Sequence, residues 1–165
     1  MKPANSTQKT KTHALGGLAL LAVILGLLFW KSFDPSFVFF SNDGPLGQQN
    51  TAWTQAPQCI GGMWDDLNSI GFTAGAFAPS TSGLIRWVAG PVGCAKFYTP
   101  IALFILGIGA WTFFRQLKLT PLAATLGALA AALGSTFFSD ACWGVASHQI
   151  AFGMDFFALA LIASN

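Results

Sequence analysis

The chain has 165 residues, of which 53% are hydrophobic and only 8% are charged. Soluble domains carry roughly 25% charged residues, so the composition predicts a membrane protein. The net charge of +2 leaves no basic surface large enough to neutralise a nucleic-acid backbone, which excludes nucleic acid as a partner.

The first predicted element is a membrane-spanning helix over residues 13–30, an uncharged apolar run. At 1.5 Å per residue this run is long enough to cross the roughly 30 Å hydrocarbon core of a bilayer. A cleavable signal peptide is the alternative, because lysines precede the run. The run exceeds the usual length of about 7 to 15 residues, however, and no small-x-small cleavage site follows it. We therefore expect an uncleaved anchor after a cytoplasmic tail, residues 1–12.

The next segment, residues 31–96, is predicted to be an outer loop that contains short helices, because it is too long for a bare connector. Residues 63–72 repeat apolar side chains at the spacing of one helical face. Residues 80–90 begin with hydroxyl side chains suited to an N-cap and end in a glycine that precedes a proline. Both helices are expected to lie on the membrane surface with their tryptophans at headgroup depth.

Three further spans follow, over residues 97–114, 121–138 and about 149–164. Small residues at positions 124, 127, 128, 131 and 134 predict close helix packing in the third span. The fourth run is shorter than the roughly 20 residues that a span needs, which indicates a truncated helix at the end of the N-terminal piece of a longer protein. A natural terminus at Asn165 is the alternative.

The predicted fold is therefore all-α and polytopic, with about four transmembrane helices. Residues 13–138 hold the first three spans, and residues 139–165 form an outer link and the fourth span. The basic residues Lys2, Lys9 and Lys11 precede the first span, and Arg115 and Lys118 occupy the turn between the second and third. The positive-inside rule places both segments in the cytoplasm and the long loop outside.

The stretch "FSNDGPLG" places Asp43 just outside the first span. Asn-Asp-Gly-Pro is turn chemistry, in which Asp or Asn bonds back to the backbone and Gly accepts a positive φ. The functional interpretation is that the turn presents the Asp43 carboxylate, with Asn42 beside it, as a general base or cation ligand for a lipid-linked substrate. The two interpretations are compatible.

Three other charged residues are candidate substrate contacts. Asp66 lies in the first surface helix, where a solvated polar face is the simpler interpretation. Arg86 lies in the second surface helix and could bind a lipid phosphate, although an arginine that only snorkels to the interface would look the same. Asp155 lies within the fourth span, where an ionisable group indicates a role in the bundle interior or in a water-filled cavity. If this segment is truncated or interfacial, Asp155 is simply solvated.

The cysteines Cys59, Cys94 and Cys142 all fall on the predicted outer side, where disulfides can form. A bond between Cys59 and Cys94 would close the outer loop, and the odd count leaves at least one thiol free. There is no CxxC motif, which argues against structural zinc. His148, at the edge of a span, is either a pigment or haem ligand or an interfacial polar residue.

Four stretches together carry a resemblance: "FSNDGPLG", "WDDLNSIG", "GPVGCAKFYTP" and "FFSDACWGVASHQIAFGMDFFAL". The chain resembles the N-terminal part of bacterial YfhO-type membrane proteins, whose architecture is similar to that of GT-C glycosyltransferases. The resemblance implies a location in the bacterial inner membrane and a polyprenyl-phosphate sugar as donor. It also implies an acidic residue of the outer loop at the reaction centre, a position matched by Asp43, with a divalent cation as an optional cofactor.

The expected function is inverting transfer of a sugar at the outer face of the membrane, with Asp43 as base and Arg86 paired with the donor phosphate. Further transmembrane helices of the same protein would complete the donor site, so the chain alone is expected to be inactive. The alternative is a non-catalytic membrane subunit that scaffolds a larger complex. A small-molecule transporter, indicated by Asp155 and the glycine-rich helices, is a third hypothesis.

Overall fold

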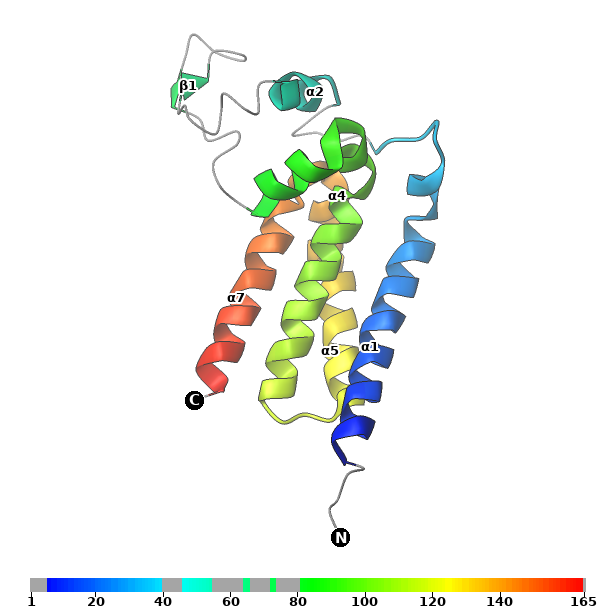
Figure 1. Cartoon of the computed structure of the whole chain (residues 1–165), viewed down its shortest axis with the longest axis vertical. Coiled ribbons are helices and arrows are strands. Elements are labelled where there is room, and N and C mark those ends of the chain that lie inside the picture. Colours follow the sequence, from blue (N-terminus) through cyan, green and yellow to red (C-terminus); the bar gives the residue numbers. More distant parts are fainter. Residues whose placement is uncertain (1–5, 40–45, 55–63, 66–71, 74–80, 165) are drawn as a thin grey trace.

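The computed structural model describes residues 6–39, 46–54, 64–65, 72–73 and 81–164. Its long elements are the helices α1 (Ser6–Leu28), α4 (Thr81–Gln116), α5 (Pro121–Leu133) and α7 (Ser147–Ala163). These helices lie side by side, and α4 occupies the middle of the bundle, in contact with the other three (Figure 1). The prediction of an all-α fold is confirmed.

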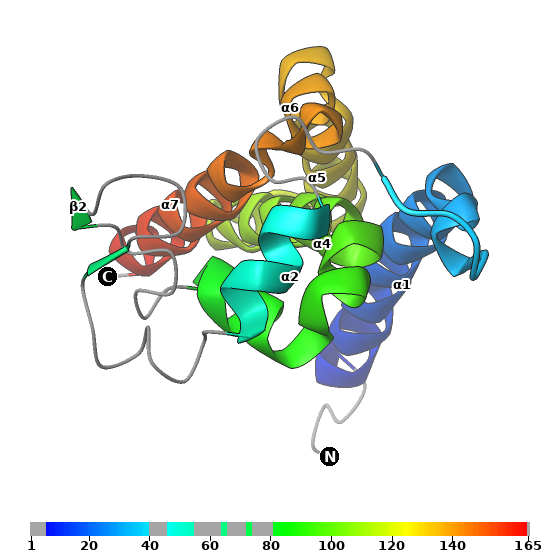
Figure 2. The same cartoon turned by 90° about the horizontal axis from the view of Figure 1, so that it is seen from above.

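The two ends of the bundle differ. One end, here called the turn end, holds the start of α1, the turn between α4 and α5, and the end of α7 (Figure 1). The other, here called the cap end, is covered by α2 (Leu46–Thr54) and by the first part of α4 (Figures 1 and 2). The start of α1 at Ser6 and the α4–α5 turn thus lie at the same end.

Helix α1 forms where the first span was expected, but it begins earlier, at Ser6, and ends at Leu28. A 3₁₀ turn, η1 (Trp30–Phe33), follows it. Leu21, Leu25 and Phe29 recur at four-residue spacing and are buried in the core. The helix is apolar on its outward side as well, a pattern that indicates apolar surroundings on every side.

Helix α4 joins two predicted elements, the second surface helix and the second span. It breaks at Gly90, which adopts φ 68° and ψ 174°. Residues 81–89 lie across the cap end, and the following part of the helix runs down through the bundle (Figure 1). The predicted start of the second span at residue 97 was therefore too late, and Pro100 lies inside the helix rather than in its first turn.

Helix α5 begins as the sequence indicated. The hydroxyl of Thr120 accepts a hydrogen bond from the Ala123 amide at 3.2 Å, and Pro121 occupies the first helical position. The helix ends at Leu133, because Gly134 takes an extended conformation with ψ 133°. The chain resumes at a bend of 46° through α6 (Ser135–Asp140) and the π-helical turn η2 (Ala141–Val145). The predicted third span is thus a broken helix.

The helix predicted over residues 63–72 is wrong in the part that the structure describes. Trp64–Asp65 forms the short strand β1, which pairs antiparallel with β2 (Phe72–Thr73). The spacing of apolar residues did not distinguish a helix from a pair of short strands, because such short runs fit both the helical and the strand periodicity. Asp66, a predicted substrate contact from the same stretch, lies outside the described residues.

Small residues set the closest helix contacts. A Cβ atom added at Gly109 of α4 would lie 2.4 Å from the carbonyl oxygen of Gly153 in α7. On α5, Ala124, Ala128 and Ala132 form a buried stripe at four-residue spacing. The predicted small-residue packing of the third span is therefore present, with Ala132 in place of Ala131 among its buried members.

Within the described residues, α4 is the one helix that is both long and apolar enough to cross a membrane. Helix α5 joined to residues 135–145 would be a second span if the bent pair is counted as one. Residues 16–28 of α1 and helix α7 are apolar but shorter. Length and composition alone thus support one or two of the four predicted spans.

Candidate functional site

The cap end is built by helix α4 folding back over itself. Because Gly90 breaks the helix, residues 81–89 return toward the first turns of the long segment that follows. The hydroxyl of Tyr98 donates a hydrogen bond to Ser82 Oγ at 2.7 Å. Ile85 from this segment and Tyr98 also pack against the core of the bundle. The cap is therefore attached to the bundle by both a hydrogen bond and apolar contacts.

Helix α2 forms a second layer over the cap, as the view from above shows (Figure 2). The indole nitrogen of Trp53 donates to the carbonyl oxygen of Trp87 at 3.4 Å. Trp53 and Trp87 both remain exposed. The prediction that Trp87 lies at headgroup depth stays a prediction.

Arg86 lies in this cap, where the sequence predicted a phosphate-binding residue. Its side chain is half-buried. The guanidinium lies against the thiol of Cys94, close enough to hydrogen-bond to it, and near the hydroxyl of Tyr98. A guanidinium carries five donors in a planar fork that can pair with two oxygens of a phosphate, which is the chemistry predicted for Arg86.

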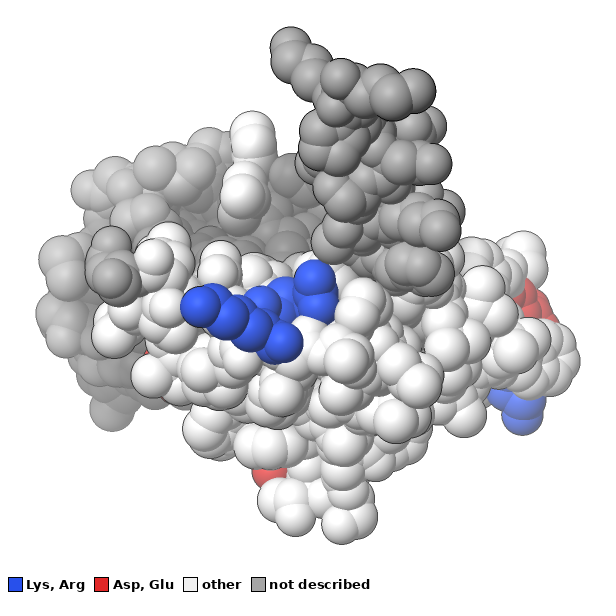
Figure 3. Space-filling model, turned by 90° about the horizontal axis from the view of Figure 1, so that it is seen from below, with Lys and Arg blue, Asp and Glu red and all other residues white. Residues whose placement is uncertain are grey.

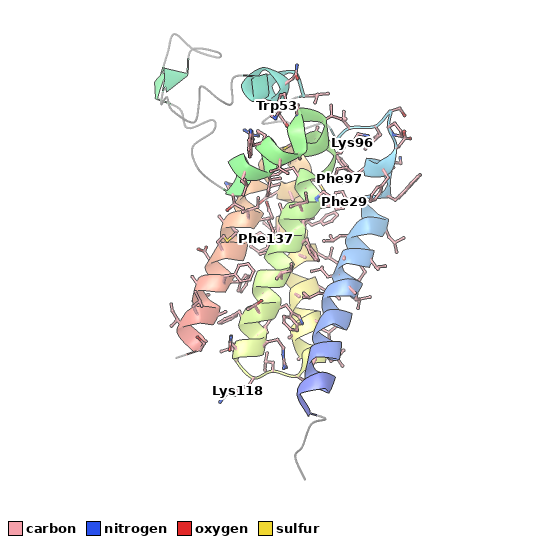
Figure 4. All side chains as sticks on the ribbon, viewed as in Figure 1. Phe29, Trp53, Lys96, Phe97, Lys118 and Phe137 are labelled. Atoms are coloured by element: carbon pink, nitrogen blue, oxygen red, sulfur yellow. The ribbon has the colours of Figure 1, made fainter. Side chains whose placement is uncertain are left out.

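A second cation of the cap end, Lys96, was not singled out by the sequence analysis. Its side chain is only 8% exposed, and its Nζ donates to the backbone carbonyl oxygen of Asp34 at 2.5 Å. Figure 4 shows Lys96 at the cap end beside Phe97, whose ring packs against that of Phe33 at 5.4 Å. Lys96 therefore joins the segment after α1 to α4. The sequence analysis placed Lys96 at the end of the outer loop, because it started the second span at residue 97. A predicted helix that started earlier would have included Lys96 and indicated its buried position.

Asp34 caps the turn that follows η1. Its Oδ1 accepts hydrogen bonds from the amide of Ser36 at 2.9 Å and from the hydroxyl of Ser36 at 2.7 Å. These two bonds hold the pKa of the Asp34 carboxyl below its usual range, and the nearby Lys96 ammonium acts in the same direction. The carboxylate is thus committed to a local turn after η1.

An aromatic cluster fixes the chain beyond this turn. The ring of Phe29 contacts those of Phe39 at 5.4 Å and Phe138 at 5.8 Å. The amide of Phe39 donates to the carbonyl oxygen of Ala95 at 3.3 Å. The chain therefore meets α4 at Phe39, immediately before the segment that carries Asn42 and Asp43.

Asn42 and Asp43 lie outside the described residues, so their predicted roles are not tested by the structure. The described residues on either side are placed: Phe39 bonds to α4, and α2, which begins at Leu46, packs on α4. Both flanking elements contact the helix that carries Arg86.

Asp155 is not brought together with Arg86. It lies in the middle of α7, eight residues after Ser147, or about 12 Å along the helix axis from the end where α7 begins. Its side chain is exposed on the outside of the bundle. Asp155 therefore does not face the interior of the bundle that the described helices form, where Gly153 and Ala160 of α7 lie instead. Its predicted alternative, a water-filled cavity, stays a prediction.

No group of three or more His, Cys, Asp or Glu side chains in the described part of the chain could hold a metal ion. Cys94 and Cys142 carry free thiols, and Cys59 lies outside the described residues, so the predicted Cys59–Cys94 bond is not seen. His148 is exposed in the first turn of α7.

Gln149 is a buried polar residue that the sequence analysis also missed. It is 0% exposed, and its Nε2 donates to the carbonyl oxygen of Phe137 at 2.8 Å. Phe137 belongs to α6, so this bond joins the broken third helix to the start of α7. The sequence signal that could have indicated this buried bond is a lone glutamine at the start of an apolar run.

Comparisons of the chain with protein-family models, with curated proteins and with solved structures found no match. The geometry of the bundle and its cap is therefore the basis for assigning a function.

Proposed function

We propose that this chain is a multi-pass membrane module of a larger membrane-embedded assembly, with its N-terminus in the cytoplasm. The observation that carries the proposal is the apolar outer surface of the bundle. Large apolar side chains are exposed on each long helix, among them Leu27 of α1, Val92 of α4, Leu126 of α5 and Ile162 of α7. A surface that is apolar on all sides suits lipid rather than water.

The charges support the proposed orientation. Arg115 and Lys118 lie at the turn end, and the space-filling view of that end shows their basic side chains together on its face (Figure 3). Lys9 and Lys11 belong to the first turns of α1, which begins at the same end (Figure 1). Basic residues concentrate on the cytoplasmic side of membrane proteins, so the turn end is assigned to the cytoplasm.

Labelling of single cysteines tests this topology. In a background without the native cysteines, Ser36→Cys at the cap end should react with a membrane-impermeant maleimide in intact spheroplasts. Lys118→Cys should react only after permeabilisation. Leu126→Cys, at a position that is 59% exposed on the outer surface of α5, should react in neither case because lipid covers it. Rapid labelling of Leu126→Cys in intact membranes would refute the membrane assignment.

A second function, sugar transfer from a polyprenyl-phosphate donor, is favoured by the position of Arg86. Arg86 belongs to residues 81–89 of α4, which lie across the cap end of the apolar bundle, the depth at which a lipid phosphate would lie in the proposed membrane. In this proposal Asp43 takes the proton of an acceptor hydroxyl as the acceptor oxygen bonds to the anomeric carbon. The bond from that carbon to the phosphate oxygen breaks, and polyprenyl phosphate leaves paired with Arg86.

Substitutions in the intact protein test this transfer. Asp43→Asn should abolish transfer without changing expression, because the amide cannot accept the proton. Arg86→Gln should raise the KM for the lipid donor about ten- to a hundredfold, the range expected when a charge-assisted hydrogen bond is lost. Lys31→Gln is the matched control, since Lys31 is an exposed cation at the same end. Full transfer by Asp43→Asn would remove the catalytic role, and an unchanged KM in Arg86→Gln would remove the phosphate contact.

A further inference from the structure

Asp155 is an acidic residue on an otherwise apolar helix surface. Helix α7 spans 17 residues, about 26 Å, and Asp155 lies at its midpoint. The side chain is exposed, and none of the described residues forms a hydrogen bond or ion pair with it. In the proposed membrane this places a carboxyl group against the hydrocarbon core, where ionisable groups are expensive and are normally paired or covered.

The surface around Asp155 has the form of a helix-packing face. The side chains one and two turns away on the same side, at three-, four- and seven-residue spacing, are exposed as well: His148, Ala151, Phe152, Ala158, Leu159 and Ile162. Ala151 and Ala158 flank the aspartate, and such small residues allow another backbone to approach closely. The opposite side of α7, with Gly153, is already packed against α4.

Charge complementarity identifies what covers this face. The described basic side chains lie toward the two ends of the bundle: Lys31, Arg86 and Lys96 at the cap end, and Arg115 and Lys118 at the turn end. A second copy in the same orientation would therefore bring no cation to the depth of Asp155, and would bring the two carboxyl groups together instead.

We propose that the outward face of α7 binds a transmembrane helix that carries a lysine or arginine near the middle of the bilayer, paired with Asp155. This inference rests on the proposed membrane location and adds to it the chemistry of the partner. The cation removes the unfavourable burial of the carboxylate, and the alanines on either side admit the partner backbone.

The test uses defined synthetic helices in phosphatidylcholine vesicles. A fluorophore-labelled leucine-alanine host helix with a central lysine is compared with the same helix carrying leucine there, and binding to the reconstituted protein is measured by energy transfer. The lysine helix should bind the native protein about tenfold more tightly than the leucine helix. The Asp155→Leu protein should bind the lysine and leucine helices equally. The Asp155→Lys protein should instead prefer a host helix with a central aspartate over the leucine helix.

A matched pair of substitutions tests the face itself. Ala158→Leu should weaken binding of the lysine helix because it fills the approach beside Asp155. Ala130→Leu, at an exposed alanine of α5, should leave binding unchanged.

Equal binding of the lysine and leucine helices to the native protein would overturn the proposal. Energy transfer between labelled copies of the protein that is lost in Asp155→Leu would also overturn it, because a second copy would then cover this face of α7. Release of the protein from vesicles by alkaline washing would instead refute the membrane assignment on which the inference rests.

Discussion

Replacing Gly109 by alanine is expected to lower the free energy of unfolding by about 2 kcal/mol, and replacing it by valine by about 3 kcal/mol or more, in line with the cost of overpacking a close contact. The reason is the position of Gly109 at the crossing of α4 and α7. A Cβ atom there would lie 2.4 Å from the carbonyl oxygen of Gly153 and 3.1 Å from its carbonyl carbon. Backbone atoms cannot rotate away, so the two helices must separate.

Two other glycines make this prediction specific. A Cβ at Gly107 would meet the Leu21 side chain at 2.5 Å, and the end of a flexible side chain can move, so Gly107→Ala should be milder. A Cβ at Gly26 would meet nothing within 4 Å, so Gly26→Ala should change stability by no more than about 0.5 kcal/mol. Titration with sodium dodecyl sulfate in mixed micelles measures the series. Equal stability of the Gly109→Ala and Gly26→Ala proteins would show that α4 and α7 do not approach this closely in the folded protein.

The sequence predicted the presence of the helices better than their ends. Apolar runs predicted α1 and α7 because an uncharged stretch of this length has few other stable arrangements. The structure begins α1 at Ser6 because polar residues such as those of the N-terminal tail are tolerated in a helix outside the apolar region. Gly134 was interpreted as a packing residue, yet it ends α5, since glycine also leaves a helix at little cost.

The direction in which α7 faces could not be read from its sequence. The helix is apolar on every side, so periodicity does not show which side packs and which side carries Asp155 outward. The decisive contact is Gly153 against Ile105 and Gly109 of α4, which depends on a residue far away in the sequence. The same limit applies to Arg86: the sequence placed it in a surface helix, but its contact with Cys94 depends on how the chain turns between them.

Gly90 makes that turn, and Gly90→Ala is expected to loosen the cap by about 1 to 3 kcal/mol, the cost of placing a residue with a Cβ in this backbone region. The φ of 68° with ψ 174° is a conformation that is essentially restricted to glycine. A Cβ at this position would meet no neighbouring atom within 4 Å, so the effect would arise from backbone strain rather than from a steric clash with the surroundings.

Accessibility of the Cys94 thiol reports this loosening directly. Cys94 is 3% exposed beneath the cap, and Arg86 lies against it. In a background with Cys59 and Cys142 replaced by serine, Gly90→Ala should raise the rate of Cys94 modification by a small thiol reagent about tenfold or more, because local opening becomes easier. Gly26→Ala is the control, since a Cβ at Gly26 of α1 would meet no atom within 4 Å. Equal rates in the two variants would mean that the conformation of Gly90 does not hold the cap closed. A faster rate in Gly90→Ala alone would show that this one backbone position brings residues 81–89 and Arg86 over the bundle.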